Sequence, residues 1–150
     1  MTRTERMEPV QRIMDDSERQ HAQRLAAAQG RLAEAEAKLA ELQRYHVEYA
    51  QSFSRQASAG TTGMALRDFQ AFLSRLAEAA QQQEHFVARA REDVAAETHH
   101  WQGAARKAKA LGMVVERWRG EENLVLERRD QQETDERAQR LHLSTVRGLG

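Results

Sequence analysis

The sequence predicts an all-α protein, an antiparallel two-helix coiled-coil hairpin whose second helix is the longer one. Three observations lead to this fold class. The 150 residues include a single proline and are rich in alanine, glutamate, glutamine, arginine and leucine, which are strong helix formers. Apolar residues recur at alternating steps of three and four, which is the spacing of a coiled-coil seam. A single cluster of turn-forming residues separates two such seams.

The first helix is predicted over residues 10–53. Pro9 is compatible with a helix start, because proline at the first helical position lacks only an amide that would be unpaired anyway. Gly30 lies inside the predicted helix at a cost of ~1 kcal/mol, which is too little to end it. The seam of this helix consists of Leu25, Ala28, Leu32, Ala35, Leu39, Leu42, His46, Tyr49 and Phe53.

The turn is predicted within residues 54–63, which concentrate small residues, hydroxyls and two glycines. Thr61 or Thr62 is expected to cap the second helix, because a threonine hydroxyl can accept a hydrogen bond from a free amide there. A turn centred near residue 58 or 59 would place Tyr49 opposite Phe69.

The second helix is predicted over residues 64–140, followed by a frayed tail at 141–150, and the whole chain is expected to form a single domain over 1–150. Whether this helix bends at Gly112 or Gly120 is left open. The residues expected to lie beyond the end of the first helix and to need a partner are Val115, Trp118, Leu124, Val125 and Leu126. The seam consists of Leu66, Phe69, Leu73, Leu76, Ala80, Gln83, Val87, Ala90, Val94, Glu97, Trp101, Ala104, Ala108, Leu111, Val115 and Trp118.

Composition excludes several functions. The chain has no cysteine, which removes disulfides, thiol nucleophiles and cysteine-based metal sites. Its 23 basic and 23 acidic residues are interspersed, which argues against a nucleic-acid partner. The apolar runs are too short for membrane insertion, and the N-terminus lacks the apolar stretch of a signal peptide. Because no phosphate-binding loop, HExxH or GxSxG motif is present, we expect no catalytic residues, no cofactor and no enzymatic activity.

Two Glu-x-x-His motifs resemble metal-binding helices. Glu18 and His21 form one motif, and Glu97 and His100 form the other, at a spacing that puts both side chains on one helix face. A di-iron bundle needs two further helices, which this chain lacks. The favoured interpretation is therefore an ion pair between Glu97 and His21 in the seam, which would fix the register of the two helices. No metal-binding residue is predicted.

A patch of aromatic and apolar residues is expected near the turn. Tyr45 and Phe72 lie just outside the seam at about the same level. They either thicken a narrow core or anchor a partner, because exposed aromatic side chains are favoured at interfaces. The predicted patch consists of Leu42, Tyr45, Tyr49, Phe72, Leu76 and Ala79.

An ordered set of motifs resembles the flagellar type III export protein family FliJ. The set is Leu39-x-x-Leu42-x-x-Tyr45-x-x-x-Tyr49, Phe69-Gln-Ala-Phe72-x-x-x-Leu76, Trp101 before a basic stretch, and Thr134-Asp-Glu-Arg-Ala-Gln-Arg140. The resemblance spans nearly the whole chain, with departures at Lys38 and Gln83.

The resemblance implies a non-enzymatic component of the bacterial flagellar export apparatus that is similar to the central stalk of rotary ATPases. The implied partners are the hexameric flagellar export ATPase, the cytoplasmic domain of the export-gate membrane protein and flagellar export chaperones. The implied location is cytoplasmic, peripheral to the inner-membrane apparatus, and a monomer is expected. The family's gate surface falls on the predicted patch. No motif of the family transfers to the ATPase-facing end, and there the overhang of the second helix leads us to expect contacts from Trp118, Asp135, Glu136 and Arg140.

Two other functions remain open at this point. The chain could be a structural scaffold that oligomerises through exposed seam edges, or a two-helix metal protein completed by dimerisation. A stable oligomer would indicate the scaffold, and stoichiometric iron or manganese would indicate the metal protein.

Overall fold

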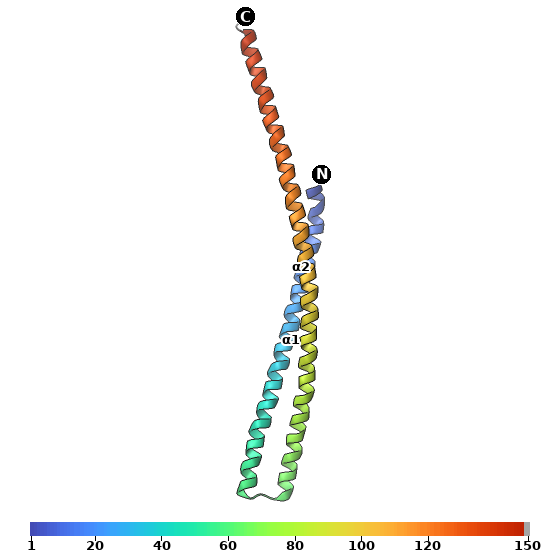
Figure 1. The fold of residues 1–150 in the computed structure, drawn as a ribbon, viewed down its shortest axis with the longest axis vertical. Helices are drawn as coiled ribbons and strands as arrows, with labels where there is room; N and C mark the ends of the chain where they lie inside the picture. The colour runs from blue at the N-terminus through green and yellow to red at the C-terminus, as the bar shows by residue number, and fades with distance from the viewer. Residues whose placement is uncertain (149–150) are drawn as a thin grey trace. The chain divides into compact units, whose positions relative to one another are not determined.

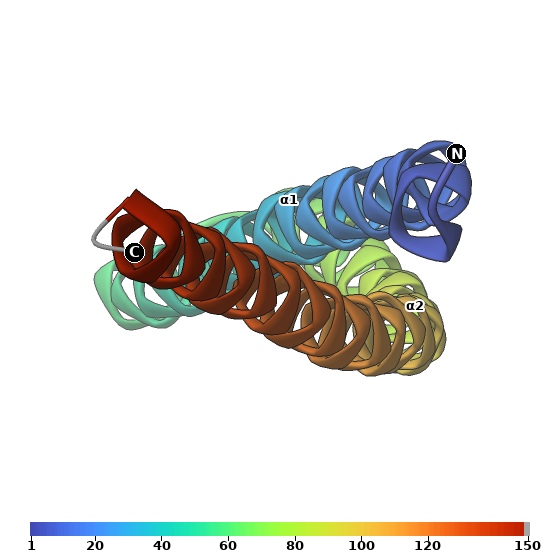
Figure 2. The same cartoon turned by 90° about the horizontal axis from the view of Figure 1, so that it is seen from above.

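The computed structural model describes residues 1–148, and within them the chain forms two α-helices and no strand (Figure 1). Helix α1 spans Arg3–Ala59 and contains 57 residues, and helix α2 spans Gly63–Gly148 and contains 86 residues. Each helix is a continuous ribbon in both views (Figure 1 and Figure 2). The predicted fold class, an antiparallel two-helix hairpin with a longer second helix, is confirmed.

Helix α1 begins seven residues before the predicted start at residue 10. Thr2 and Glu5 form a capping box: the amide of Glu5 donates to Thr2 Oγ1, and the amide of Thr2 donates to Glu5 Oε2, both at 3.1 Å. Pro9 therefore lies inside the helix. The capping box and contacts of Arg3 and Thr4 with α2 offset the backbone hydrogen bond that Pro9 cannot donate.

The loop between the helices is shorter than predicted and consists of residues 60–62. Gly60 has a φ of 81°, a left-handed conformation that is typical of the residue after a helix C-terminus. Thr62 caps α2, because its Oγ1 accepts from the amide of Ala65 at 3.2 Å. Residues 54–59 stay helical, and the Ser58 hydroxyl donates to the Ser54 carbonyl at 3.0 Å, so the hydroxyls did not end the helix.

Helix α2 also continues past its predicted end at residue 140. The expected frayed tail is helical over residues 141–148, while residues 149 and 150 lie outside the described part of the chain. The hydroxyls of Thr134 and Thr145 donate to carbonyls four residues earlier, at 2.8 and 2.9 Å. Loss of the apolar pattern therefore does not end a helix that contains no breaker.

Contacts between the helices divide the chain into two compact units. The loop unit is Glu18–Ala104, and the terminal unit combines Met1–Ser17 with the chain from Ala105 onwards. In the loop unit every predicted seam residue except Tyr49 is buried or half-buried. Ala28 and Val87 are the buried apolar residues there, and the buried Gln83 donates from Nε2 to the Ala35 carbonyl at 3.0 Å. The side chain of Gln83, which lies in the predicted seam, therefore forms a hydrogen bond from α2 to the backbone of α1.

The terminal unit corrects the expectation that Val115 and Trp118 have no partner. Because α1 begins at Arg3, its first turns pack against this part of α2, and Val115 is only 1% exposed. The Arg3 guanidinium lies 4.6 Å from the centre of the Trp118 ring, within range of a cation–π interaction. Thr4 is buried, and its hydroxyl donates to Glu122 Oε1 at 2.9 Å. The seam therefore extends from Val115 to Glu122.

We predict that Gly60→Ala destabilises the chain by about 1–2 kcal/mol, because an L-residue with a side chain is strained at positive φ. Gly63→Ala is the matched control, since Gly63 is the first residue of α2 and a Cβ there meets no neighbour. This control should be neutral or stabilising. Urea unfolding of both variants measures the difference, and equal effects of the two would contradict the left-handed assignment.

Candidate functional site

An aromatic cluster joins α1 and α2 near the loop. The Tyr49 ring lies edge-on to Phe72, with ring centres 5.0 Å apart and planes at 83°. Tyr49 also meets Phe69 at 6.3 Å, which confirms the predicted pair, and Phe53 lies 5.5 Å from Phe69. Edge-to-face pairs at these distances stabilise by ~0.5–1.5 kcal/mol each. The cluster holds the two helices together while leaving large aromatic surfaces open.

The predicted patch is partly exposed. Tyr45, Tyr49 and Phe72 are 41%, 42% and 38% exposed. Leu42, Leu76 and Ala79 are half-buried. The structure brings the rings of Tyr49 and Phe72 into contact. Phe72 therefore packs against the first helix, although it lies outside the predicted seam.

Tyr45 makes its hydrogen bond within its own helix. Its hydroxyl donates to Glu41 Oε1 at 3.0 Å. This hydrogen bond, with the negative charge of Glu41, raises the pKa of Tyr45 above its ordinary value of 10.0. The phenol therefore remains a hydrogen-bond donor at neutral pH, and the interaction is lost as the pH rises through that raised pKa. The ring of Tyr45 is held at the edge of the patch by this bond.

Sequence reasoning missed three exposed apolar residues elsewhere in the loop unit, one of which is Met64 at the start of α2, 75% exposed. Phe86 and Val47 are 52% and 55% exposed, and the Arg89 guanidinium lies 4.9 Å from the centre of the Phe86 ring. Val47 lines a shallow groove with His46 and Ala80. The signal in the sequence is weak, because each of these residues stands beside the seam as a single apolar side chain.

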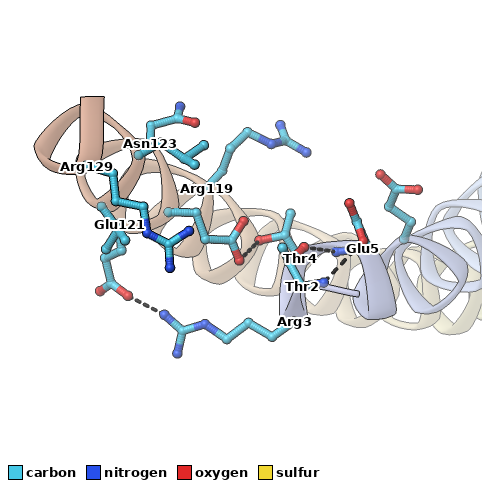
Figure 3. Close-up of a pocket in the computed structure, with 12 residues that line it drawn as sticks. Thr2, Arg3, Thr4, Glu5, Arg119, Glu121, Asn123 and Arg129 are labelled. Carbon is cyan, nitrogen blue, oxygen red and sulfur yellow. Dashed lines mark hydrogen bonds and ion pairs between the residues drawn. The ribbon is translucent and has the colours of Figure 1, made fainter. Parts of the chain in front are cut away.

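A second candidate surface is a groove of about 610 Å³ in the terminal unit (Figure 3). Two interactions between α1 and α2 join residues that line it: the ion pair of Arg3 with Glu121 and the hydrogen bond from Thr4 to Glu122. Its apolar wall is formed by Val125 and Leu126, which are 52% and 55% exposed. The groove therefore combines exposed apolar surface with charges of both signs, as a protein interface does.

The residues predicted to face the ATPase do not form one cluster. Trp118 is half-buried beneath Arg3. Asp135, Glu136 and Arg140 are exposed, and Arg140 Nη2 lies 3.7 Å from Glu136 Oε2 in the next turn of α2. Such an exposed ion pair contributes little to stability. These side chains are therefore free to meet a partner.

The predicted ion pair between Glu97 and His21 is wrong. Glu97 Oε2 lies 3.8 Å from His100 Nδ1 on its own helix, and the His21 ring lies 6.0 Å from the His100 ring. His21 Nδ1 and Glu97 Oε2 are buried atoms without a hydrogen bond, which is costly in a narrow seam. Among residues 1–148, no group of three or more His, Asp or Glu side chains is placed to hold a metal ion.

Comparison with protein families matches nearly the whole chain. The family model described as Flagellar FliJ protein matches residues 3–147. The chain belongs to the FliJ family. Neither a curated protein nor a solved structure gives a significant match to it.

Membership of the FliJ family makes the chain a component of the flagellar export apparatus, and the family is a non-catalytic one. Within residues 1–148, neither helix contains a stretch long and apolar enough to cross a bilayer. Of the two departures from the FliJ resemblance, Gln83 is a buried seam residue that bonds across the helices, and Lys38 is exposed. Gln83 therefore does not form the edge of the aromatic patch.

We predict that replacing both His21 and Glu97 with leucine preserves or raises the melting temperature. Removing two buried polar groups that lack hydrogen bonds, and filling the seam with apolar volume, is often neutral or stabilising by ~1–4 kcal/mol. Thermal unfolding in metal-free buffer measures this. Unfolding of the native chain by a chelator alone would instead show that these residues hold a structural metal.

Proposed function

We propose that this FliJ family member is a stalk-like, non-enzymatic component that promotes assembly and activity of the hexameric flagellar export ATPase. It also contacts the cytoplasmic domain of the export gate and assists export chaperones, and thereby supports motility and chemotaxis. The family match over residues 3–147 carries this proposal. A cytoplasmic position beside the inner-membrane apparatus and a monomeric state belong to the same proposal, as does a single domain over 1–150, since both helices are continuous.

The proposed gate surface is the aromatic patch of the loop unit. Tyr45, Tyr49 and Phe72 keep roughly two-fifths of their surface exposed, although Tyr49 lies in the seam and the other two lie beside it. Aromatic residues that are held in place by neighbours lose little conformational entropy when a partner covers them. The ring contact between Tyr49 and Phe72 and the hydrogen bond of Tyr45 to Glu41 provide this preorganisation. The remaining members of the proposed surface, Leu42, Leu76 and Ala79, are half-buried.

The proposed ATPase surface belongs to the terminal unit. Leu124, Val125 and Leu126 are each more than half exposed, although they follow directly on a packed seam. Helix α2 then continues through Asp135, Glu136 and Arg140 with every described side chain exposed. A helix of this length without a packing partner is marginal by itself, so a partner that covers it would stabilise it.

A structural scaffold that oligomerises through seam edges is the alternative function. The exposed apolar residues Ile13 and Met113 in the terminal unit favour it. The two functions differ in solution mass, because the scaffold requires a stable oligomer in the absence of other proteins. A monomer that binds the ATPase supports the export function.

We predict that the double variant Tyr45→Ala/Phe72→Ala loses at least ~2 kcal/mol of binding to the isolated gate domain. Each substitution should cost the free chain less than the ~3–5 kcal/mol of a buried aromatic truncation, because both rings are partly exposed. Calorimetry of gate binding and thermal unfolding of the free variant measure the two effects. Stimulation of the ATPase should persist, since that contact is assigned to the terminal unit.

Phe86→Ala is the matched control for this variant, because Phe86 is a similarly exposed aromatic residue outside the patch. Its gate affinity should equal that of the native chain. A double variant that binds the gate normally but melts much earlier would show that Tyr45 and Phe72 serve the core only.

We also predict that the full chain shifts the purified ATPase toward hexamers and raises its rate of ATP hydrolysis. Removing residues 131–150 should abolish the shift without unfolding the rest, because this segment contains only exposed side chains where the structure describes it. Mass photometry and phosphate release measure both effects. Unchanged ATPase assembly with the full chain would contradict the proposed function.

A further inference from the structure

The terminal unit carries a second row of residues on α2, three or four positions apart, on the side opposite the buried Val115. Steps of three and four residues keep side chains on one face of a helix, and this row is about half a helical turn away from Val115. The row, here called the outward row, consists of Arg106, Lys109, Met113, Arg117, Gly120, Leu124 and Arg128. The packed seam therefore leaves it facing solvent.

The basic residues of the outward row lack intramolecular partners. All four, Arg106, Lys109, Arg117 and Arg128, are exposed. Within residues 1–148 none of them forms an ion pair, whereas Arg119, which lies off the row, pairs with Glu116. Three glutamates, Glu116, Glu121 and Glu127, stand along the edges of the row, and in the described part of the chain none of them forms an ion pair with its basic residues. The positive charge of the row is therefore available to a partner.

Met113 and Leu124 add apolar surface to the same face, being 61% and 53% exposed. Gly120 lies between Arg117 and Leu124, and a Cβ built there meets no atom within 4 Å. Internal packing thus gives no reason for a glycine that weakens a helix interior. The other described glycines also have open space beside them, so what distinguishes Gly120 is its place in the row, where a partner backbone can approach α2 closely.

We propose that the outward row binds an α-helix of a protein partner that presents carboxylates beside apolar side chains. The steps of the row are three, four, four, three, four and four residues, which keep its members along one strip of α2 where a second helix can pack. The basic side chains select carboxylates, while Met113 and Leu124 supply apolar contacts. This surface is separate from the aromatic patch, and the inference does not depend on which partner the patch or the ATPase surface binds.

The shape of the row favours a helix over a membrane or a nucleic acid. Glu116 and Glu127 flank the row on one side and Glu121 flanks it on the other. A flat anionic bilayer or a run of phosphates would meet these carboxylates as well as the basic residues, and would be repelled by them. A helix contacts only a narrow strip, and basic residues on its own edges could pair with the flanking glutamates.

The test uses the full chain and a synthetic helix-forming peptide of about four heptads, with leucine at positions a and d and glutamate at e and g. A second peptide carries glutamine in place of glutamate. Fluorescence anisotropy measures the affinity of each peptide at low and high salt. Binding to vesicles that contain phosphatidylglycerol tests whether the row binds a membrane instead. Sedimentation of the chain alone tests whether the row binds a second copy of the chain.

One variant reverses the charge of the four basic residues of the row, and a matched variant reverses the charge of four exposed arginines of the loop unit. The row variant is Arg106→Glu, Lys109→Glu, Arg117→Glu and Arg128→Glu; the matched variant is Arg24→Glu, Arg31→Glu, Arg67→Glu and Arg75→Glu. The glutamate peptide should bind the native chain and the matched variant equally, and bind the row variant about tenfold more weakly. High salt should weaken native binding, because exposed charges are screened.

Gly120→Ala tests close approach without risk of unfolding. It should raise the melting temperature by about 2–4 °C and weaken peptide binding, whereas Gly112→Ala should raise the melting temperature and leave binding unchanged. The proposal is overturned if the glutamate peptide does not bind the native chain or binds no better than the glutamine peptide. Equal weakening by both fourfold variants, row-dependent vesicle binding or row-dependent self-association would overturn it as well.

Discussion

A seam only two side chains wide determines most of what this chain can do. In a two-helix hairpin each layer of the core contains one residue from each helix, so few side chains are fully covered. Among residues 1–148 the buried apolar side chains are Ala28, Val87 and Val115. Side chains beside the seam therefore remain partly exposed, and function must reside on surfaces along the helices. The aromatic patch, the terminal groove and the outward row are three such surfaces.

Polar groups in so thin a core specify how the helices pair. Gln83 donates to the Ala35 carbonyl, and Thr4 donates to Glu122, so each bond requires one relative position of α1 and α2 within its unit. A slip by one turn would leave these buried groups without partners. His21 and Glu97 behave differently, because their buried atoms make no hydrogen bond across the two helices. Within each unit, register is therefore specified by a buried amide or hydroxyl group that bonds across the two helices.

The sequence predicted the seam far better than the helix ends. Heptad spacing identified Leu66 to Trp118 on the second helix, because burial follows helix periodicity directly. The start at Arg3 was missed because the capping box of Thr2 and Glu5 precedes the first apolar residues of the pattern. The cation–π contact of Trp118 was missed for the same reason. Tyr49 and Phe69 were paired correctly, whereas the bond of Tyr45 to Glu41 depends on a side-chain rotamer that spacing does not reveal.

Assignment to the flagellar export apparatus rests on the family match, and the exposed surfaces indicate how the chain would act there. The most direct test is the amount of flagellin exported by cells of the native bacterium that lack this chain. Export should fall strongly and should return when the native chain is supplied. Flagellin export that is unchanged without the chain would contradict the account.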